Sequence, residues 1–340
     1  MIPVKFTKPP KSMRKNRVTT QDIADKAGVS KATVSYALNG TGSVSPEMVK
    51  KILAYAEELG YQENRLAKAT RTGKTGTIGL VLPDLCNPFF PKMAQAVVES
   101  ASAKGYSVFL VDARNSLDEE ALGISRLIQY AIEGLIWCPL DDQHSIKRNK
   151  ISCPVVMTDR SIPGFDCVYA NSQKGGRLQA ELLKSKGHKK IGVLSGPKRS
   201  ASAQIRRKGL YDALGRSVKV AWDFSVEYEL DIPEKIAESI LKSDVSCIVA
   251  ANDTLAIGVL RLLHGAGIQV PEQVSIIGFD AIEWSDLVSP PLTTIGLPIK
   301  EIGTSAFDLL LTRFDNPDAA IREVMLDVFP IERQSLKALS

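Results

Sequence analysis

Cysteine and histidine, which build most metal clusters and disulfide frameworks, are scarce in this 340-residue sequence. The cysteines are odd in number and include no C-x-x-C pair; they are Cys86, Cys138, Cys153, Cys167 and Cys247. The three histidines lie far apart along the chain. This pattern argues against a disulfide scaffold or a zinc cluster and is typical of a reducing cytoplasm. We therefore expect neither a metal nor a cofactor.

Long apolar segments and enzyme signatures are also missing. No uninterrupted apolar run approaches the ~18 residues that span a bilayer. The basic start, MIPVKFTKPPKSMRKNR, lacks the apolar core of a secretory signal. There is no G-x-S-x-G, Walker A, H-E-x-x-H or helix-opening G-x-G-x-x-G motif. The expectation is a cytoplasmic protein that is not in the membrane and is not an enzyme.

Charge, in contrast, is present but unevenly distributed. Residues 1–75 hold fourteen Lys/Arg and six Asp/Glu, whereas residues 76–340 hold 29 basic and 32 acidic residues. A basic head on a mildly acidic body is typical of a nucleic-acid-binding module, because clustered cations release the counterions condensed on phosphates. The uneven charge distribution by itself is explained equally well by a charged tail exposed to solvent. At about 150 residues per domain, the length predicts two or three domains.

The pattern of residues 18–60 predicts three short helices. Thr20 and Ser30 are the expected N-caps of the first two, and Ser45 followed by Pro46 opens the third. Only a tight turn separates the first two helices, which is the spacing of a helix-turn-helix. An apolar stripe at helical spacing marks the buried face of the third helix: Val49, Ile52, Leu53, Ala56 and Leu59.

In a helix-turn-helix the second helix enters the major groove. Val34 and Leu38 then belong to the core. The residues left facing outward are Ser30, Lys31, Ala32, Ser35 and Tyr36. A lysine can donate to guanine O6 or N7, an alanine can contact a thymine methyl group, and a tyrosine can stack or hydrogen-bond.

The exact amino-acid sequence of this segment is more specific than its pattern of helices. VTTQDIADKAGVSKATVSYALNG, followed by VS-x-E, LGY and N-R-x-A, closely resembles the DNA-binding head of the LacI/GalR family of bacterial transcription regulators, without gaps. The resemblance implies three base-reading residues, which are Lys31, Ala32 and Tyr36. It also implies three residues at or near the phosphate backbone, which are Thr19, Ser30 and Asn39.

This resemblance implies that the chain is divided into four parts. They are a basic extension predicted to be disordered (1–17), a helix-turn-helix domain (18–62), a hinge (63–76) and a two-lobed effector-binding and dimerisation domain (77–340). Residues 1–16 precede the usual family start, so either they form a real basic arm or translation starts at Met13.

The hinge is a flexible or weakly helical linker by composition. In the family it becomes a helix on operator binding, and paired hinges enter the minor groove. The DNA-contacting residues implied here are Arg65, Lys68, Thr70 and Arg71. Thr70 stands where relatives usually have a leucine that wedges between base pairs, so we expect a shallower DNA kink in this protein.

From residue 78 onward, apolar strands alternate with amphipathic helices. The expected strands are IGLVLP, YSVFLVD, GLIWCP, PVVMTD, CVYAN, KIGVLSGP, CIVAAND and VSIIGFD, and the expected helices lie near 89–104, 119–132, 173–186, 203–214, 233–242 and 254–265. Such alternation predicts parallel sheets with helices on both faces. The segment is too long for one ordinary sheet. The predicted fold class is therefore a two-lobed α/β body preceded by a small all-α domain.

Polar residues follow these strands at their carboxyl ends, where open α/β sheets bind ligands. Carboxylates, amides and an arginine beside aromatic rings suit a polyhydroxylated ligand, because each hydroxyl needs hydrogen-bond partners and sugar faces stack on aromatic rings. Asp and Asn are also common turn residues, so a single position carries little weight, whereas the whole set carries more.

The body is also similar to the LacI/GalR family, whose effector domain has the fold of periplasmic sugar-binding proteins. GPKRSASAQIRRKGL places Arg206 on the family's effector-gripping arginine and Ser202 on a frequent hydroxyl contact. AANDTLAIG and IIGFD place Asn252 and Asp280 on effector contacts. The implied pocket further contains Asp84, Phe89, Phe90, Asp159 and Tyr228. Trp222 and Phe224 are alternative candidates for the aromatic role of Tyr228.

The predicted function is a sequence-specific repressor of a carbohydrate-utilisation operon, with double-stranded palindromic DNA, a small sugar or sugar derivative, and a second copy of the chain as partners. Ser200 stands where purine-binding relatives hold an arginine, which disfavours a purine. The sequence ends without the heptad tail of tetrameric relatives, which favours a homodimer. The alternatives are a sugar-binding protein of the transport type and a regulator that answers to a non-sugar metabolite.

Overall fold

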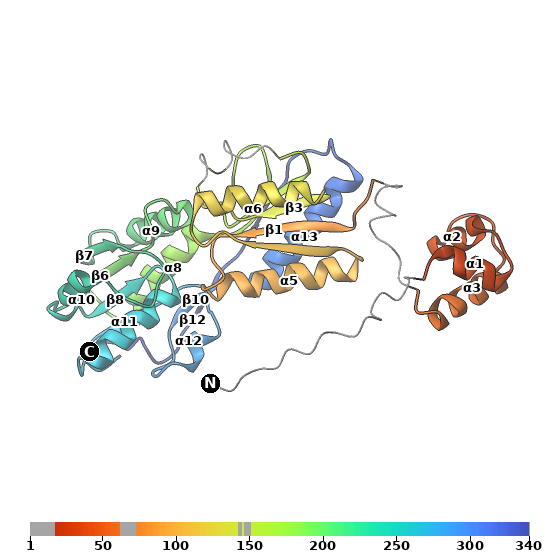
Figure 1. The fold of residues 1–340 in the computed structure, drawn as a ribbon. Coiled ribbons are helices and arrows are strands. Elements are labelled where there is room, and N and C mark those ends of the chain that lie inside the picture. The colour runs from red at the N-terminus through yellow and green to blue at the C-terminus, as the bar shows by residue number, and fades with distance from the viewer. Residues whose placement is uncertain (1–17, 62–72, 142–144, 146–150, 340) are drawn as a thin grey trace, which may run out of the picture. The chain divides into compact units, whose positions relative to one another are not determined.

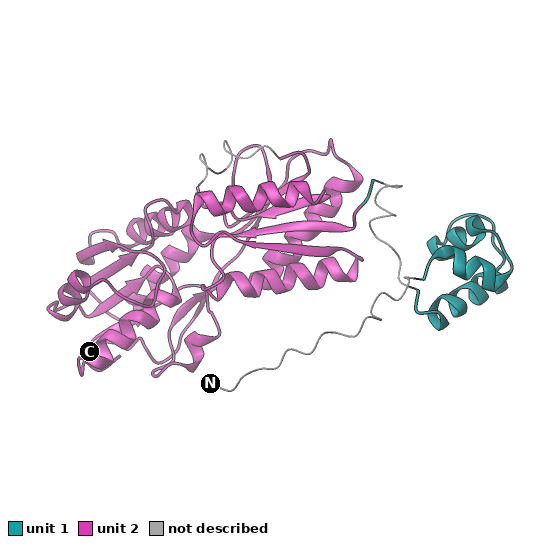
Figure 2. Cartoon of the chain, in the orientation of Figure 1, with its two compact units in different colours: residues 1–74 teal, residues 75–340 magenta. Residues whose placement is uncertain are grey.

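The computed structural model describes residues 18–61, 73–141, 145 and 151–339. The chain divides into two compact units, residues 1–74 and residues 75–340 (Figure 2). The predicted basic extension and the hinge residues Arg65, Lys68, Thr70 and Arg71 lie outside the described residues.

Unit 1 is a bundle of three helices, α1 (Thr20–Ala27), α2 (Lys31–Asn39) and α3 (Pro46–Glu58) (Figure 1). Its core consists of Ile23, Ala24, Ala27, Val34, Ala37, Ile52 and Ala56. The prediction for Leu53 was wrong, since its side chain is 49% exposed. A helix in so small a bundle is covered on one side only, and Ile52 and Ala56 already occupy that side of α3.

The predicted N-cap of α1 was also wrong, by one residue. Thr19 is the cap: its hydroxyl accepts from the Asp22 N–H at 3.4 Å, and the Asp22 carboxylate accepts from the Thr19 N–H at 2.7 Å. This reciprocal capping box needs an acidic or amide residue three positions on. Thr20 cannot form it because the residue three positions after it is Ile23. The caps Ser30 and Ser45 were predicted correctly.

Unit 2 contains two lobes. The first lobe is built on a six-stranded sheet in the order β11-β5-β4-β3-β1-β2, in which all neighbours are parallel. Its strands are β1 (Thr77–Leu82), β2 (Ser107–Asp112), β3 (Gly134–Trp137), β4 (Val155–Thr158), β5 (Asp166–Ala170) and β11 (Glu323–Leu326). Helix α6 (Leu117–Gln129) covers one face, and α5 (Phe89–Ala103) and α13 (Ile299–Asp315) cover the other (Figure 1).

The second lobe is built on a four-stranded parallel sheet in the order β7-β6-β8-β9. Its strands are β6 (Lys190–Ser195), β7 (Lys219–Ser225), β8 (Cys247–Ala250) and β9 (Ser275–Ile277), and its helices are α8 (Ser172–Ser185), α9 (Ala201–Leu214), α10 (Glu234–Leu241) and α11 (Asp253–Gly265). An antiparallel pair, β10 (Thr294–Gly296) and β12 (Phe329–Ile331), and the short helix α12 (Trp284–Leu287) complete the unit.

The predicted two-lobed α/β fold class is confirmed, and so are all eight predicted strands and six predicted helices of the body. The elements that were not predicted are β7, β10, β11, β12, α12 and α13. The omission of α13 and β11 matters most. These two elements come from the end of the sequence but belong to the first lobe, so the chain crosses between the lobes more than once.

A close crossing of α8 and α9 positions one wall of the space between the lobes. Each helix has a glycine at the crossing: a Cβ on Gly176 would collide with the Arg206 carbonyl oxygen, and a Cβ on Gly209 would collide with the Gln173 carbonyl oxygen. Because these atoms are backbone, neither helix can relieve the collision by moving a side chain alone.

We expect Gly176→Ala to lower the free energy of unfolding by about 1–3 kcal/mol, because the added methyl group must push α9 away from α8. Denaturant titration measures this loss. The matched control is Gly265→Ala at the end of α11, where a Cβ meets nothing within 4 Å. Alanine has the higher helix propensity, so this control is expected to keep or slightly raise stability. Equal stability of the two variants would contradict the close-packing argument.

Candidate functional site

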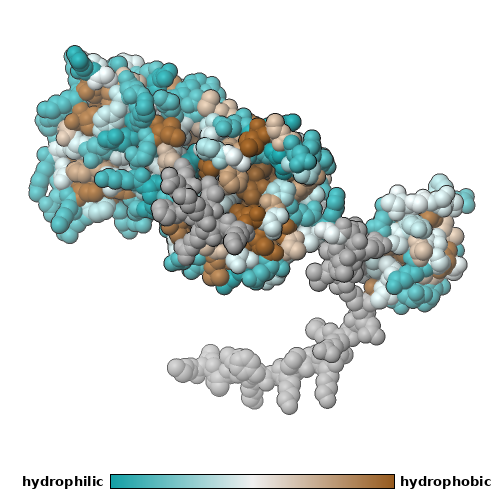
Figure 3. All heavy atoms as spheres, turned by 90° about the horizontal axis from the view of Figure 1, so that it is seen from above, coloured by the Kyte–Doolittle hydropathy of each residue, from teal (hydrophilic) through white to brown (hydrophobic). Residues whose placement is uncertain are grey.

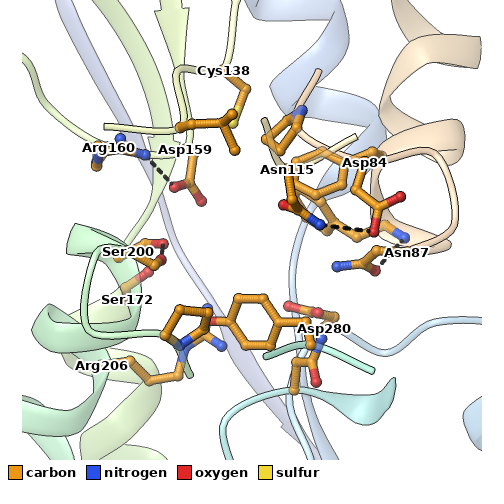
Figure 4. A pocket seen from close by; sticks show the side chains of 18 of the residues that line it. Asp84, Asn87, Asn115, Cys138, Asp159, Arg160, Ser172, Ser200, Arg206 and Asp280 are labelled. Carbon is orange, nitrogen blue, oxygen red and sulfur yellow. Dashed lines mark hydrogen bonds and ion pairs between the residues drawn. The ribbon is translucent and has the colours of Figure 1, made fainter. Parts of the chain in front are cut away.

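A cleft lies between the two lobes, at the carboxyl ends of the parallel strands. Its empty space of about 930 Å³ includes a part that is open to solvent. All nine predicted effector-site residues line it: Asp84, Phe89, Phe90, Asp159, Ser202, Arg206, Tyr228, Asn252 and Asp280. Figure 4 shows labelled polar side chains from both lobes converging on this space.

The first lobe contributes an amide-and-carboxylate wall after β1 and β2. Asn115 Nδ2 donates to Asp84 Oδ2 at 3.2 Å (Figure 4). Asn87 Oδ1 accepts from the Phe89 N–H at 3.1 Å, at the start of α5. The rings of Phe89 and Phe90 then meet edge to face, 5.1 Å apart. Polar hydrogen-bonding groups therefore lie beside an apolar aromatic surface.

Asp159 and Arg160 follow β4 and form an ion pair in which the arginine is buried and the aspartate is partly exposed. Arg160 Nη1 donates to Asp159 Oδ2 at 2.8 Å, and Arg160 Nη2 donates to the Pro139 carbonyl oxygen at 2.8 Å (Figure 4). Arg160 thereby holds the segment after β3, which also lines the cleft. Asp159 has a φ of +80°, in the left-handed region that non-glycine residues seldom occupy and that is common at functional sites.

Arg206 projects from α9 into the second-lobe wall. Its guanidinium carbon lies 3.5 Å from the centroid of the Phe279 ring, and Nη1 donates to the Ala251 carbonyl oxygen. Two buried donors of this wall, Arg206 Nε and Asn252 Nδ2, have no hydrogen-bond partner among the described residues. An unpaired buried donor costs about 1–3 kcal/mol, so an acceptor on a bound molecule would relieve that cost.

Asp280 follows β9 and is buried. Burial raises the pKa of Asp280 well above its ordinary value; the Arg206 charge opposes this shift, while Asp253 and Asp159 add to it. Its φ of +107° is again left-handed. Just behind it, Asp253 accepts from the Thr294 hydroxyl at 2.6 Å, and burial raises the pKa of Asp253 to about 7.

Tyr228 is the aromatic residue of the second-lobe wall. Its phenol packs against Gly196 so closely that a Cβ there would collide with the ring. Burial raises the pKa of Tyr228 to about 12, so the hydroxyl stays neutral and can donate. The two alternative aromatic candidates, Trp222 and Phe224, stack on each other at 5.2 Å and do not line the cleft.

Several lining residues were not among the predicted site residues, notably Asn115, Ser172, Arg199 and Glu227. Asn115 follows a predicted strand, so the rule used for the other strand ends would have found it. Glu227 follows β7, which was not predicted. No local sequence pattern predicts that Arg199 lines the cleft, because its position there depends on the fold of both flanking loops.

Unit 1 presents the predicted reading residues on its surface. Lys31 and Ala32 are exposed in the first turn of α2. Tyr36 is 49% exposed, and its ring packs on Gly42, where a Cβ would collide with it. Ser35 is half-buried. Lys31, Ala32 and Tyr36 therefore present exposed side chains on the outer face of α2, and the tyrosine ring also packs within the unit.

The three residues predicted to lie near phosphates make local bonds. Thr19 forms the capping box of α1, and the Ser30 hydroxyl accepts from the Thr33 N–H at 3.1 Å. Asn39 Nδ2 donates to the Ser35 carbonyl oxygen at 2.6 Å. Each of these side chains thus stabilises a helix end or turn, whatever it contacts outside the unit.

Two other kinds of site are absent from the described part of the chain. No helix there is long and apolar enough to cross a membrane. In the same residues, no group of three or more His, Cys, Asp or Glu side chains is arranged to hold a metal ion.

Comparisons with known proteins match both units. Residues 19–64 match the model for bacterial regulatory proteins of the lacI family, and residues 75–332 match that for periplasmic binding proteins and the sugar binding domain of the LacI family. The ribose operon repressor of Escherichia coli (strain K12) is 31% identical over 93% of this chain and 99% of its own length. The HTH-type transcriptional repressor PurR of Aliivibrio salmonicida is 32% identical, covering 87% of this chain and 92% of its own.

A solved structure extends the match to three dimensions. The Lac repressor dimer bound to operator and the anti-inducer ONPF superposes with a TM-score of 0.85 and is 28% identical, covering 95% of this chain and 100% of that one.

Proposed function

Because this chain belongs to the LacI family of bacterial regulatory proteins, we propose that it represses a carbohydrate-utilisation operon and that a small sugar bound in the cleft changes its affinity for operator DNA. The observation that carries the proposal is the cleft itself. Arg206 and Asn252 offer buried donors without partners among the described residues, and aromatic rings flank them. Such an arrangement suits the hydroxyl groups and ring faces of a sugar.

On the DNA side, we propose that α2 enters the major groove. Lys31 and Tyr36 are exposed on that helix, and a lysine at its first turn is placed to donate to a guanine edge. Thr19, Ser30 and Asn39 would support the contact near phosphates while keeping their helix-end bonds.

We further propose that the cleft binds its ligand without transforming it. The relatives named above are repressors. Cys138, the thiol that lines the cleft, is a poor nucleophile, since burial raises its pKa well above the ordinary value and only the thiolate attacks. A repressor acts on the chromosome, so we propose a cytoplasmic location.

Selection of bound sequences from random duplex DNA, followed by band shifts with a panel of sugars and purine bases, tests this function. The expected result is a palindromic operator whose complex responds to one class of sugar. Failure to select any sequence would contradict operator binding. A response confined to purines would show that the effector is a purine and not a sugar.

We propose that the functional unit is a homodimer, as in the Lac repressor structure. An apolar face on the first lobe supports this. Strand β2 is an edge of the six-stranded sheet; its Phe109 and Leu110 are exposed, and the Phe109 ring contacts the exposed ring of Tyr130. Exposed apolar edges invite pairing with another chain. Figure 3 shows apolar patches, in brown, among the hydrophilic surface of unit 2.

Leu110→Glu is expected to weaken dimerisation by about 100-fold or more, because a charge would be buried in a closed interface. Sedimentation velocity at graded concentrations measures the change. The control is Met325→Glu: Met325 is 56% exposed on β11, the opposite edge of the same sheet. If the Leu110→Glu variant dimerises as tightly as the Met325→Glu control, β2 lies outside the interface.

A further inference from the structure

Within the described residues, three guanidinium groups line the cleft, and each already has a partner. They are Arg160, Arg199 and Arg206. The same cleft is lined by four carboxyl groups, those of Asp84, Asp159, Glu227 and Asp280. Even without Asp280, the carboxyl groups equal the guanidinium groups in number, so the side chains that line the cleft do not favour the entry of an anion.

The Arg199–Glu227 pair is the most specific of these contacts. Arg199 Nη1 donates to Glu227 Oε1 at 2.5 Å, and Nη2 donates to Oε2, so both oxygens occupy the guanidinium fork. The two side chains are 43% and 46% exposed, at the accessible part of the cleft. Arg199 precedes α9 and Glu227 follows β7, so the pair joins two loops of the second lobe.

The other two arginines are occupied in different ways. Arg160 is paired with Asp159 and bonded to a backbone carbonyl, with 4% of its side chain exposed. Arg206 lies over the Phe279 ring and is bonded to the Ala251 carbonyl oxygen, with Asp280 close enough to feel its charge. Arg160 therefore presents no uncommitted fork to a phosphate or carboxylate, while Arg206 keeps one donor without a partner among the described residues, Nε, which is buried.

Helix N-termini at the cleft are the remaining source of positive charge. Side chains cap the first turn of three helices that begin there, whereas α5, which also begins there, has no side-chain cap, although Asn87 Oδ1 accepts from its first N–H. Asn171 accepts from Lys174 N–H in α8, Ser200 from Ala203 N–H in α9, and Asn252 from Leu255 N–H in α11. The caps use donors that would otherwise attract an anion.

We propose that the cleft selects an uncharged effector, and that Glu227 is a specificity-determining residue because it fills the fork of Arg199. A guanidinium fork fits a phosphate or carboxylate in two-pronged geometry, so Arg199 without its partner would hold the anionic group of a ligand. This inference rests on the proposed function and names the ligand class of that site: free sugars rather than sugar phosphates or sugar acids.

Glu227→Gln is the decisive variant. It keeps the size of the side chain, removes the negative charge and leaves the Arg199 charge in place. The ratio of affinity for a sugar phosphate to affinity for the corresponding free sugar is expected to rise about 10-fold or more, as a charge-assisted contact becomes available. The matched control is the double variant Arg199→Gln/Glu227→Gln, which loses both charges and should lose the gain.

Calorimetry on the full chain would use ribose, glucose and fructose beside ribose 5-phosphate, glucose 6-phosphate and fructose 6-phosphate. For the wild type, we expect at least one free sugar to bind, with its phosphate about 100-fold weaker or more, since a charge would be desolvated without a partner. Both side chains of the pair are nearly half exposed, so folding of the variants is expected and is checked by circular dichroism.

The outcomes separate the two claims. A wild type that binds a phosphate as tightly as its free sugar, or a Glu227→Gln variant whose affinity ratio does not move, overturns the charge selectivity and leaves a sugar-responsive repressor standing. A wild type that binds none of the six compounds contradicts the sugar effector itself, and with it the selectivity that rests on it.

Discussion

Arg206→Ala is expected to abolish the effector response while leaving operator affinity without effector nearly intact. The guanidinium stacks on Phe279, and its buried Nε is unpaired among the described atoms, so it is placed to donate to a ligand. Hydrogen bonds from a charged group are worth about 1.5–3 kcal/mol each, which predicts an affinity loss of about 100-fold if two are made. Calorimetry measures sugar binding, and band shifts with and without sugar measure the response.

The neighbouring arginine on α9 supplies the control. Arg207 pairs with Asp223 at 2.6 Å and does not line the cleft. Arg207→Ala should therefore keep both sugar binding and the operator response. If the Arg206→Ala variant still responds to the effector with unchanged affinity, Arg206 is an ordinary structural residue of the helix. The proposal that it binds the effector is then wrong.

Lys31→Ala is expected to cost about 1–3 kcal/mol of operator affinity and to relax base preference at one symmetric operator position. The lysine is exposed in the first turn of α2, so its replacement should leave the fold of unit 1 intact. Band shifts against an operator series, with each position varied in turn, measure the change.

Lys50→Ala removes the same charge from an exposed position on α3 and is the matched control. It should weaken all sequences alike, because it alters only the nonspecific attraction to phosphates. Identical effects of the two variants at every operator position would show that Lys31 contributes charge and does not read a base.

Most elements of this fold could be predicted from the sequence because their signals are local. Ser30 and Ser45 cap helices through atoms three residues away, and the buried strands of the body are short apolar runs between helical patterns. Strands β10 and β12 are only three residues long, which is too short to show an alternation of apolar and polar residues. Helix α13 was missed despite its 17 residues, and its place in the first lobe depends on packing against α5 and the sheet.

The sequence by itself determined the family of this protein and nine of the residues that line the cleft. It could do so because the carboxyl ends of parallel strands meet at one edge of a sheet, so polar residues that end successive strands must converge. The tertiary structure excluded Trp222, which the sequence had left as an alternative to Tyr228, from the cleft, and it alone decided that Glu227 fills the fork of Arg199. Both outcomes depend on contacts between loops that are distant in sequence, where side-chain pairing follows from how β6, β7 and α9 pack and leaves no local pattern.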